Sequence, residues 1–134
     1  MRQTLLLFLL CLLAGSCHTD NRNETDTQGL PPDTLAPYYY NLRAQGHFEA
    51  YLNAMHSCDS TTPAYKQQMI RLLRHHQLEV NQTKQGVNRV ELLRTEMHNH
   101  NRMAHAFLKV TYNDSTHEEV MFPLVFDGKQ WRIQ

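Results

Sequence analysis

The sequence predicts an α+β domain in which helical segments come first and an antiparallel sheet follows. Between residues 103 and 133, apolar and polar residues alternate in three segments, which are separated by an Asn-Asp turn and an Asp-Gly turn. This period of two is typical of an antiparallel meander with one buried face. Between residues 47 and 80 the apolar residues instead follow a helical period. We expect these N-terminal helices to pack on one face of a curved antiparallel sheet.

The chain opens with a segment that is typical of a secretory signal peptide. Arg2 supplies one positive charge before an unbroken apolar run over residues 5–13, which is too short to span a bilayer as a mature helix. Small residues then lead directly to Cys17. This arrangement resembles the lipobox of bacterial lipoproteins, in which the leader is cut before the cysteine and the cysteine carries lipid. We therefore expect residues 1–16 to be a lipoprotein signal peptide and Cys17 to be the lipidation site. The alternative is an ordinary cleavage site with a chance cysteine.

Residues 17–34 are expected to form a disordered tether between the lipid and the domain. From His18 to Ala36 the chain has no apolar periodicity, and Asn, Asp, Thr, Gln and Pro predominate. The lipobox resemblance implies several acyl chains on one residue, which make a stable membrane anchor. His18 stands where some bacteria place an Asp as an inner-membrane retention signal. Its presence favours the outer membrane, with the domain facing the periplasm or the cell exterior.

Three helices are predicted before the sheet. The first covers residues 37–45, with Pro37 in its first turn and Gly46 at its end. The second begins at His47, and the third follows a Thr62-Pro63 start signal and closes at residues 84–86. The second helix has an apolar stripe of Phe48, Tyr51, Leu52 and Met55, and the third has Tyr65, Met69, Leu72, Leu73, His76 and Val80 along one side.

The predicted sheet has a first strand over residues 87–97, followed by the three strands of the meander. Pro123 lies in the middle strand of the meander and predicts a bulge or a break in the ladder there. The indole of Trp131 is expected against the helices, near Phe48, Leu52 and Leu73. The buried face is expected to consist of Ala104, Ala106, Leu108, Val110, Tyr112, Val120, Phe122, Leu124, Phe126, Trp131 and Ile133.

Two motifs resemble nuclear transport factor 2-like domains, which have a cone-shaped α+β fold. Residues 44–51 (Ala-Gln-Gly-His-Phe-Glu-Ala-Tyr) are similar to a helix break of that family. Residues 127–133 (Asp-Gly-Lys-Gln-Trp-Arg-Ile) are similar to its closing strand, with one extra residue before the Trp. The resemblance covers roughly residues 35–134, which we assign to the domain. The chain as a whole looks like small bacterial lipoproteins with a short version of this fold, since it has no room for the hairpin that larger members place before the third helix.

Enzymes of this superfamily place an Asp, His or Tyr inside the cone. Here the inward face of the last three strands is expected to be wholly apolar. The polar residues of these three strands have the opposite parity and are expected on the outer face: His105, Lys109, Thr111, Glu119, Gln130 and Arg132. General acid–base catalysis needs titratable groups in one pocket, and only the helices are left to supply them, through Tyr38, Tyr39, Tyr40, His47, His56, Tyr65 or His76. We therefore predict no catalytic residue and no enzymatic activity. A pocket in the cone would be lined by Tyr39, Phe48, Tyr51, Leu52, Tyr65, Leu73, Phe122 and Trp131.

Metal, thiol and nucleic-acid chemistry are not expected. None of the nine histidines belongs to an HExxH motif or to a paired-cysteine motif, so we predict neither a metal nor a cofactor. Cys58 is the only cysteine of the predicted domain. We interpret it as a packing residue, with a thiol–imidazole pair with His56 as the alternative. The 13 basic and 13 acidic residues cancel, which argues against nucleic-acid binding.

Three triplets resemble the Asp-Ser/Thr acceptor of a periplasmic O-glycosylation system found in some lipoprotein-rich bacteria. They cover residues 33–35, 59–61 and 114–116, and their acceptors are Thr34, Ser60 and Ser115. Helix caps and turns favour the same residue types. Both interpretations stay open for Thr34, and the turn interpretation is the favoured one for Ser60 and Ser115.

The sequence therefore predicts a lipid-anchored cell-envelope protein with a non-catalytic binding or scaffolding domain. The alternative is a small-molecule-binding domain with an apolar cone pocket and weak hydrolytic or isomerase-like chemistry. The expected partners are the membrane, through the lipid, and either an envelope protein, an apolar small molecule or a second copy of the chain. An open cavity with a polar group inside would favour the alternative, whereas a cone filled by Tyr, Phe, Leu and Trp side chains would favour the binding domain.

Overall fold

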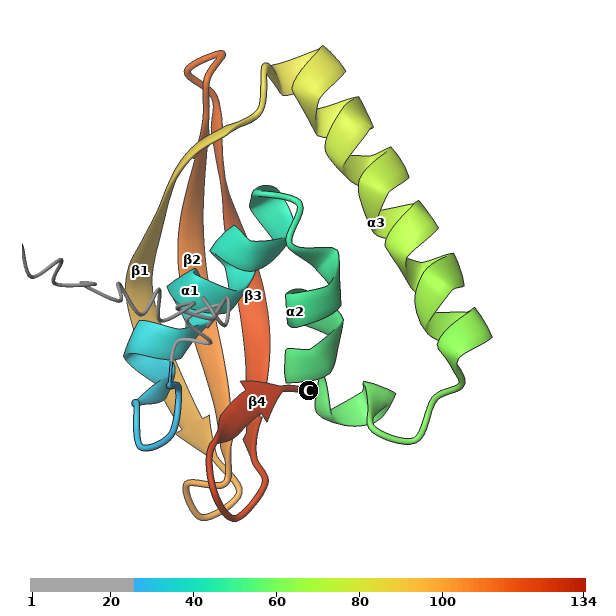
Figure 1. The fold of residues 1–134 in the computed structure, drawn as a ribbon. Helices are drawn as coiled ribbons and strands as arrows, with labels where there is room; N and C mark the ends of the chain where they lie inside the picture. Colours follow the sequence, from blue (N-terminus) through green and yellow to red (C-terminus); the bar gives the residue numbers. More distant parts are fainter. Residues whose placement is uncertain (1–25) are drawn as a thin grey trace, which may run out of the picture.

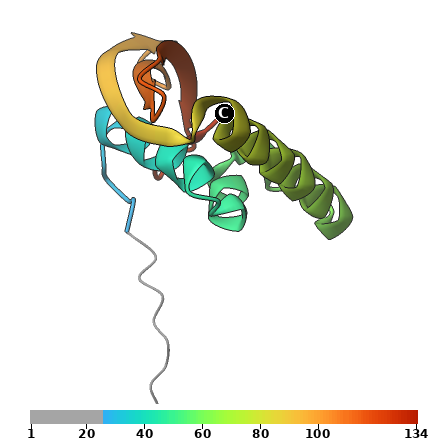
Figure 2. The same ribbon diagram turned by 90° about the horizontal axis from the view of Figure 1, so that it is seen from above.

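The structure is a computed structural model, and it describes residues 26–134. Within this range a four-stranded antiparallel sheet in the order β1-β2-β3-β4 follows three α-helices and a short 3₁₀-helix. Helices α1 and α2 lie on the concave face of the sheet, and α3 runs beside them at the margin (Figure 1). Figure 2 shows how the sheet curves around α1 while α3 projects away from it. The predicted α+β architecture is confirmed. The predicted signal peptide, Cys17 and the first part of the predicted tether lie outside the described residues.

Helix α1 (Pro32–Ala44) begins five residues earlier than predicted. Pro32 occupies the first turn, where a missing N–H costs nothing, and Pro37 lies inside the helix. The helix tolerates Pro37 because Leu35 and Ala36, both fully buried, hold its first turns against the sheet. Residues 32–34, which were assigned to the tether, are therefore helical.

Helix α2 (Phe48–Ala54) and the 3₁₀-helix η1 (His56–Cys58) follow Gly46, whose positive φ of 83° turns the chain after α1. The predicted start of α3 (Pro63–Lys84) is confirmed, because the Thr62 side chain accepts the N–H of Tyr65 at 3.2 Å. Its predicted end is confirmed as well, since Gln85 and Gly86 both adopt a positive φ.

The inward side of α3 differs from the predicted stripe. Ile70 is the one buried residue of the helix, whereas Tyr65 and Leu72 are 47% and 58% exposed. The amide of Gln77 also faces inward and donates a hydrogen bond to the Ala44 carbonyl at 3.0 Å. The stripe is rotated because α3 packs against α2 and the start of β1 and does not lie across the sheet.

The strands are β1 (Val87–His98), β2 (Met103–Tyr112), β3 (His117–Phe126) and β4 (Trp131–Ile133). The predicted parity is confirmed most clearly in β2, where Ala104, Ala106, Leu108, Val110 and Tyr112 are all buried. Ala104, Ala106 and Leu108 form the core together with residues of α1 and α2. The core therefore lies between the concave face and α1.

The bulge predicted at Pro123 does not occur. Strand β3 pairs with β2 in one unbroken register from Met103–Val125 to Thr111–His117. Pairing between β3 and β4 begins only at Leu124–Ile133, and the carbonyl of Pro123 accepts the N–H of Gln134. The missing N–H of proline thus lies on the side where β4 has ended, so it breaks no ladder bond. The bulges lie in β1 instead, between Val87 and Arg89 and between Leu92 and Arg94.

We expect the two faces of β3 to differ sharply in their contribution to stability. Leu124 is fully buried, whereas Met121 on the opposite face is 47% exposed. Leu124→Ala should lower the free energy of unfolding by about 2–5 kcal/mol, and Met121→Ala should change it by about 0.5 kcal/mol or less. Urea unfolding of residues 26–134, followed by far-ultraviolet circular dichroism, measures both. Equal shifts of the two midpoints would mean that the strand is turned over.

Candidate functional site

The residues predicted to line a cone pocket do not surround one common cavity. Tyr39, Phe48, Tyr51, Leu52 and Phe122 are packed into the hydrophobic core and are at most 6% exposed. Leu73 and Trp131 are half-buried at its margin, and Tyr65 lies exposed on α3. The indole of Trp131 contacts the ring of Phe126, with ring centres 5.5 Å apart, and lines a shallow hollow with Leu30 and Met97. It therefore lies against the segment before α1, which was not the predicted neighbourhood.

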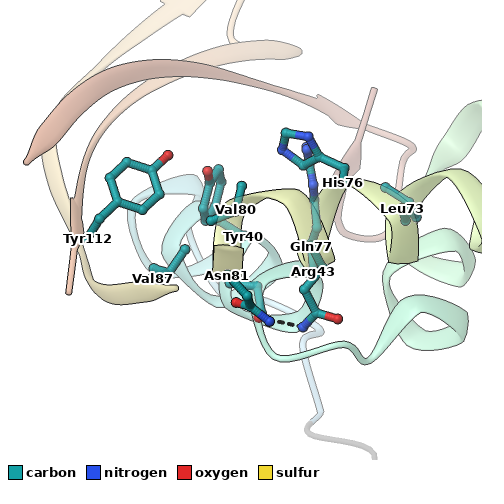
Figure 3. A pocket seen from close by; sticks show the side chains of 10 residues that line it. Tyr40, Arg43, Leu73, His76, Gln77, Val80, Asn81, Val87 and Tyr112 are labelled. Carbon is teal, nitrogen blue, oxygen red and sulfur yellow. Dashed lines mark hydrogen bonds between the residues drawn. The ribbon is translucent and has the colours of Figure 1, made fainter. Parts of the chain in front are cut away.

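A narrow cleft remains between the C-terminal half of α3, the end of α1 and the sheet (Figure 3). Its free volume is about 30 Å³, which is room for a water molecule or two. The hydrogen bond from Gln77 to Ala44 holds its two helical walls together. The cleft is lined by Tyr40, Arg43, Ala44, Leu73, His76, Gln77, Val80, Asn81, Val87 and Tyr112.

Tyr112 lines this cleft on its sheet side and is paired with the exposed Glu118, although the inward face was expected to be wholly apolar. Glu118 is directly opposite Val110 in the register, so it points to the same, inward face. The hydroxyl of Tyr112 donates a hydrogen bond to the Glu118 carboxylate. The signal was present in the sequence, because Glu118 has the same parity as Val120 and Phe122. The expectation of an apolar inward face is therefore wrong at this position.

The electrostatics of the pair limit what it can do chemically. Burial, followed by the hydrogen bond to the Glu118 carboxylate, raises the pKa of Tyr112 far above its usual range. Burial also raises the pKa of Tyr40. The ammonium group of Lys84 lies 4.3 Å from the centre of the Tyr112 ring and covers it. Both phenols stay protonated at neutral pH, so they can orient a ligand as hydrogen-bond donors but cannot serve as a base.

The position of Arg132 also differs from the prediction, since its side chain was expected on the solvent face but is only 11% exposed. Its guanidinium donates to both carboxylate oxygens of Asp59, at 2.5 and 2.6 Å. It also donates to the backbone carbonyls of Asn53 and Met55, at 2.9 and 3.1 Å. These carbonyls belong to the end of α2, where the helix itself supplies no donors. The α2–η1 segment wraps around the edge strand β4 and so covers a side chain that would otherwise be exposed.

The predicted glycosylation acceptors are all exposed. Thr34 lies in the first turn of α1, Ser60 follows η1, and Ser115 lies in the β2–β3 turn with a φ of 72°. Two of the preceding aspartates have structural partners: Asp59 binds Arg132, and Asp114 accepts hydrogen bonds from the backbone N–H and the hydroxyl of Thr116. The turn chemistry that was favoured is thus present at residues 114–116, whereas Asp59 is held by an ion pair with a residue of β4.

The cysteine and the histidines are not gathered into one site. Cys58 is buried in the core. Within residues 26–134, no three His, Cys, Asp or Glu side chains are close enough to hold a metal ion together. The rings of His98 and His105 lie tilted against each other, with ring centres 4.5 Å apart, on the outer side of the sheet. No helix of the described part is long and apolar enough to cross a membrane.

We expect the Arg132 cluster to contribute strongly to stability. Arg132→Met removes the donors from Asp59 and from the end of α2, and it should lower the free energy of unfolding by roughly 1.5–3 kcal/mol. Arg71→Met, an exposed position on α3, is the matched control and should change little.

The acid dependence of this stability has a defined sign. The hydrogen bond from Arg132 lowers the pKa of Asp59 below its ordinary value. The stabilisation by the Asp59–Arg132 pair is therefore complete above the unfolded-state pKa of Asp59, which is about 4. It is lost as the pH falls through the lower folded-state pKa of Asp59. Asp59→Asn should be less stable than the wild type at pH 7 and should lose less stability on acidification to pH 2. Parallel curves for the two proteins would contradict this assignment.

Comparison with known proteins supports the fold. No protein-family model matches the chain, and no curated protein matches it in sequence. A crystal structure from Campylobacter jejuni, of a protein named provisionally as an NTF2-like transpeptidase, superposes with a TM-score of 0.64 at 10% sequence identity. The match covers 78% of this chain and 97% of that chain. At this identity the likeness concerns the fold alone, and the chain has an α+β fold of the NTF2-like kind.

Proposed function

We propose that this protein is a lipid-anchored component of the bacterial outer membrane whose NTF2-like domain binds or scaffolds without catalysis. The leader and the small residues before Cys17 support the anchor. The observation that supports the role of the domain is that the cone is filled by its own side chains. Leu35, Leu52, Leu108 and Leu124 are all at most 1% exposed where a substrate would have to enter.

A filled interior argues against an enzyme of the usual NTF2-like kind. Acid–base chemistry needs titratable groups that a substrate can reach. The inward phenols are protonated donors, and the Glu118 carboxylate is already engaged by Tyr112. A transpeptidase, as the Campylobacter jejuni protein is named, commonly needs a nucleophile that its substrate can reach. Cys58 is only 5% exposed and is packed in the core. We therefore propose no transpeptidase activity for this chain.

Exposed apolar side chains on α3 support a binding role. Leu72, Leu78 and Tyr65 are 58%, 52% and 47% exposed on this one helix. Tyr65 and Leu72 are seven positions apart and therefore lie on one side of α3, and exposed apolar groups on one side of a helix that stands off the core favour contact with another molecule there.

The second candidate is a small-molecule-binding domain, and the cleft beside Tyr112 favours it. Protonated Tyr40 and Tyr112, the Arg43 guanidinium and the His76 ring gather around one hollow. A ligand there would have to displace α3, because the free volume is only about 30 Å³.

Native mass spectrometry of the protein isolated from its membrane separates the two candidates. We expect masses that the chain and its covalent modifications account for, with no retained small molecule. A retained small molecule that is lost in Leu73→Trp, which fills the cleft, would overturn the binding-domain proposal in favour of the second candidate. Leu78→Trp, at an exposed position of the same helix, is the matched control.

The anchor is tested by metabolic labelling with an alkyne-tagged fatty acid in a bacterial host. Wild type should take up the label and sediment with the outer membrane. Cys17→Ser should take up none and should keep its leader, because the thiol is the acceptor for the lipid. Cys58→Ser is the matched control and should label like the wild type. An unlabelled wild type would show that Cys17 follows an ordinary cleavage site.

A further inference from the structure

Strand β1 forms a free edge of the sheet. It spans 12 residues and pairs only with β2, and in the part of the chain that the structure describes no other backbone group hydrogen-bonds to residues 88–97. Figure 1 shows β1 as the outermost strand, at the end opposite β4. A long unpaired edge is a template for another strand. We propose that β1 pairs antiparallel with β1 of a second copy, edge to edge, so that two sheets join about a two-fold axis.

The charges on β1 are self-complementary in such a pairing. Arg89, Glu91, Arg94 and Glu96 lie opposite Thr111, Lys109, Phe107 and His105 of β2, respectively, so all four share the outer face of the sheet. Along the strand their signs alternate: positive, negative, positive, negative. An axis between Leu92 and Leu93 sets Arg89 opposite Glu96 of the second copy, and Glu91 opposite Arg94. Every arginine then meets a glutamate, and both members of each pair lie on the same face.

Neighbouring registers are excluded by the same charges. A shift of two residues in one direction sets Arg89 opposite Arg94 of the second copy. A shift of two residues in the other direction sets Glu91 opposite Glu96. Like charges directly opposite one another destabilise a strand pair, so the charge pattern selects a single register.

The bulge in β1 is what makes this complementarity possible. Leu92 pairs with Leu108 and Arg94 pairs with Phe107, so Leu93 is an extra residue on β1. Without it, Arg94 and Glu96 would point to the opposite face from Arg89 and Glu91. Leu93 is 47% exposed and lies at the proposed axis, where Leu92 and Leu93 of the second copy would cover it. The ladder would run in two equal halves on either side of this bulge.

The contacts that these charges make within one chain are weak competitors. Arg89 and Glu91 are 3.5 Å apart, and so are Arg94 and Glu96, and all four side chains are 41–63% exposed. Surface pairs of this kind contribute little. Arg94 also binds Glu119 at 3.1 Å and lies over the ring of Phe107. The pair of Arg89 with Glu96 of the second copy therefore gives the cleaner test. The chain has a net charge of zero, so no long-range repulsion opposes association.

The test is sedimentation equilibrium of the full chain in a density-matched nonionic detergent, across a range of protein concentrations. Wild type should be in monomer–dimer equilibrium. Arg89→Glu places two glutamates opposite two glutamates and should weaken the dimer by about tenfold. The double variant Arg89→Glu with Glu96→Arg exchanges the two charges and should restore the dimer. Arg71→Glu, at an exposed position on α3, changes the net charge as Arg89→Glu does, and Arg71→Glu with Glu79→Arg leaves it unchanged as the double variant does; neither control should have an effect.

Three outcomes would overturn the proposal. A wild type that stays monomeric up to several hundred micromolar would mean that the charged edge keeps copies apart, as charged edges do in many sheets. A dimer that Arg89→Glu leaves unchanged would lie on another surface. A double variant that stays as weak as the single one would exclude this register. Far-ultraviolet circular dichroism of each variant separates lost association from lost folding.

Discussion

The interaction on which the architecture depends is the capture of Arg132 by the end of α2 and by Asp59. One guanidinium joins the last strand of the sheet to the carbonyls of Asn53 and Met55 and to a carboxylate 73 positions away. A bidentate pair fixes both direction and distance, because the planar guanidinium matches the carboxylate edge to edge. A parallel bridge between Met55 and Ile133 runs beside it. Strand β4 spans only three residues, so these contacts keep it on the sheet.

Helix α3 is packed much more loosely against the rest of the domain than strand β4 is. Helix α3 is 22 residues long but buries only Ile70, because it touches α2 and the start of β1 and leaves most of its length in solvent. Helices α1 and α2 and the sheet together fill the cone, through residues such as Leu35, Tyr39, Leu52 and Leu108. The cleft beside Tyr112 is the seam between this tight layer and the loosely packed helix. Both proposals for what the domain binds follow from this difference in packing.

The outer face of the sheet at β1 carries an ordered set of charges. On β1 the charges alternate in sign on one face, and a bulge keeps them there. An edge of this kind can repel other strands or select one, since the same alternation is unfavourable in most registers and favourable in one. Leu93 and Met97 remain 47% and 42% exposed on this strand, so β1 combines apolar surface with an ordered set of charges.

The sequence by itself determined the fold class, the order of the elements and the parity of the sheet. These follow from local periodicity, since a residue two positions along a strand returns to the same face whatever the rest of the chain does. The inward position of Glu118 follows from the same periodicity, because Glu118 has the parity of Val120. The caps at Thr62 and Gly86 belong to the same category, because capping depends on residues a few positions apart.

Only the tertiary structure decided the positions that depend on distant partners. Arg132 has outward parity, yet it is buried because α2 and η1, more than seventy residues earlier in the chain, wrap around β4. The start of α1 also depends on distant partners, because the burial of Leu35 keeps the segment helical through Pro37. Pro123 breaks no hydrogen bond of the ladder, because β4 ends at Ile133, before the position opposite Pro123. The rotation of α3 follows from which neighbours it meets and not from its own apolar pattern. Local periodicity assigns a residue to a face, but which surface covers that face is set by packing between segments that are remote in sequence.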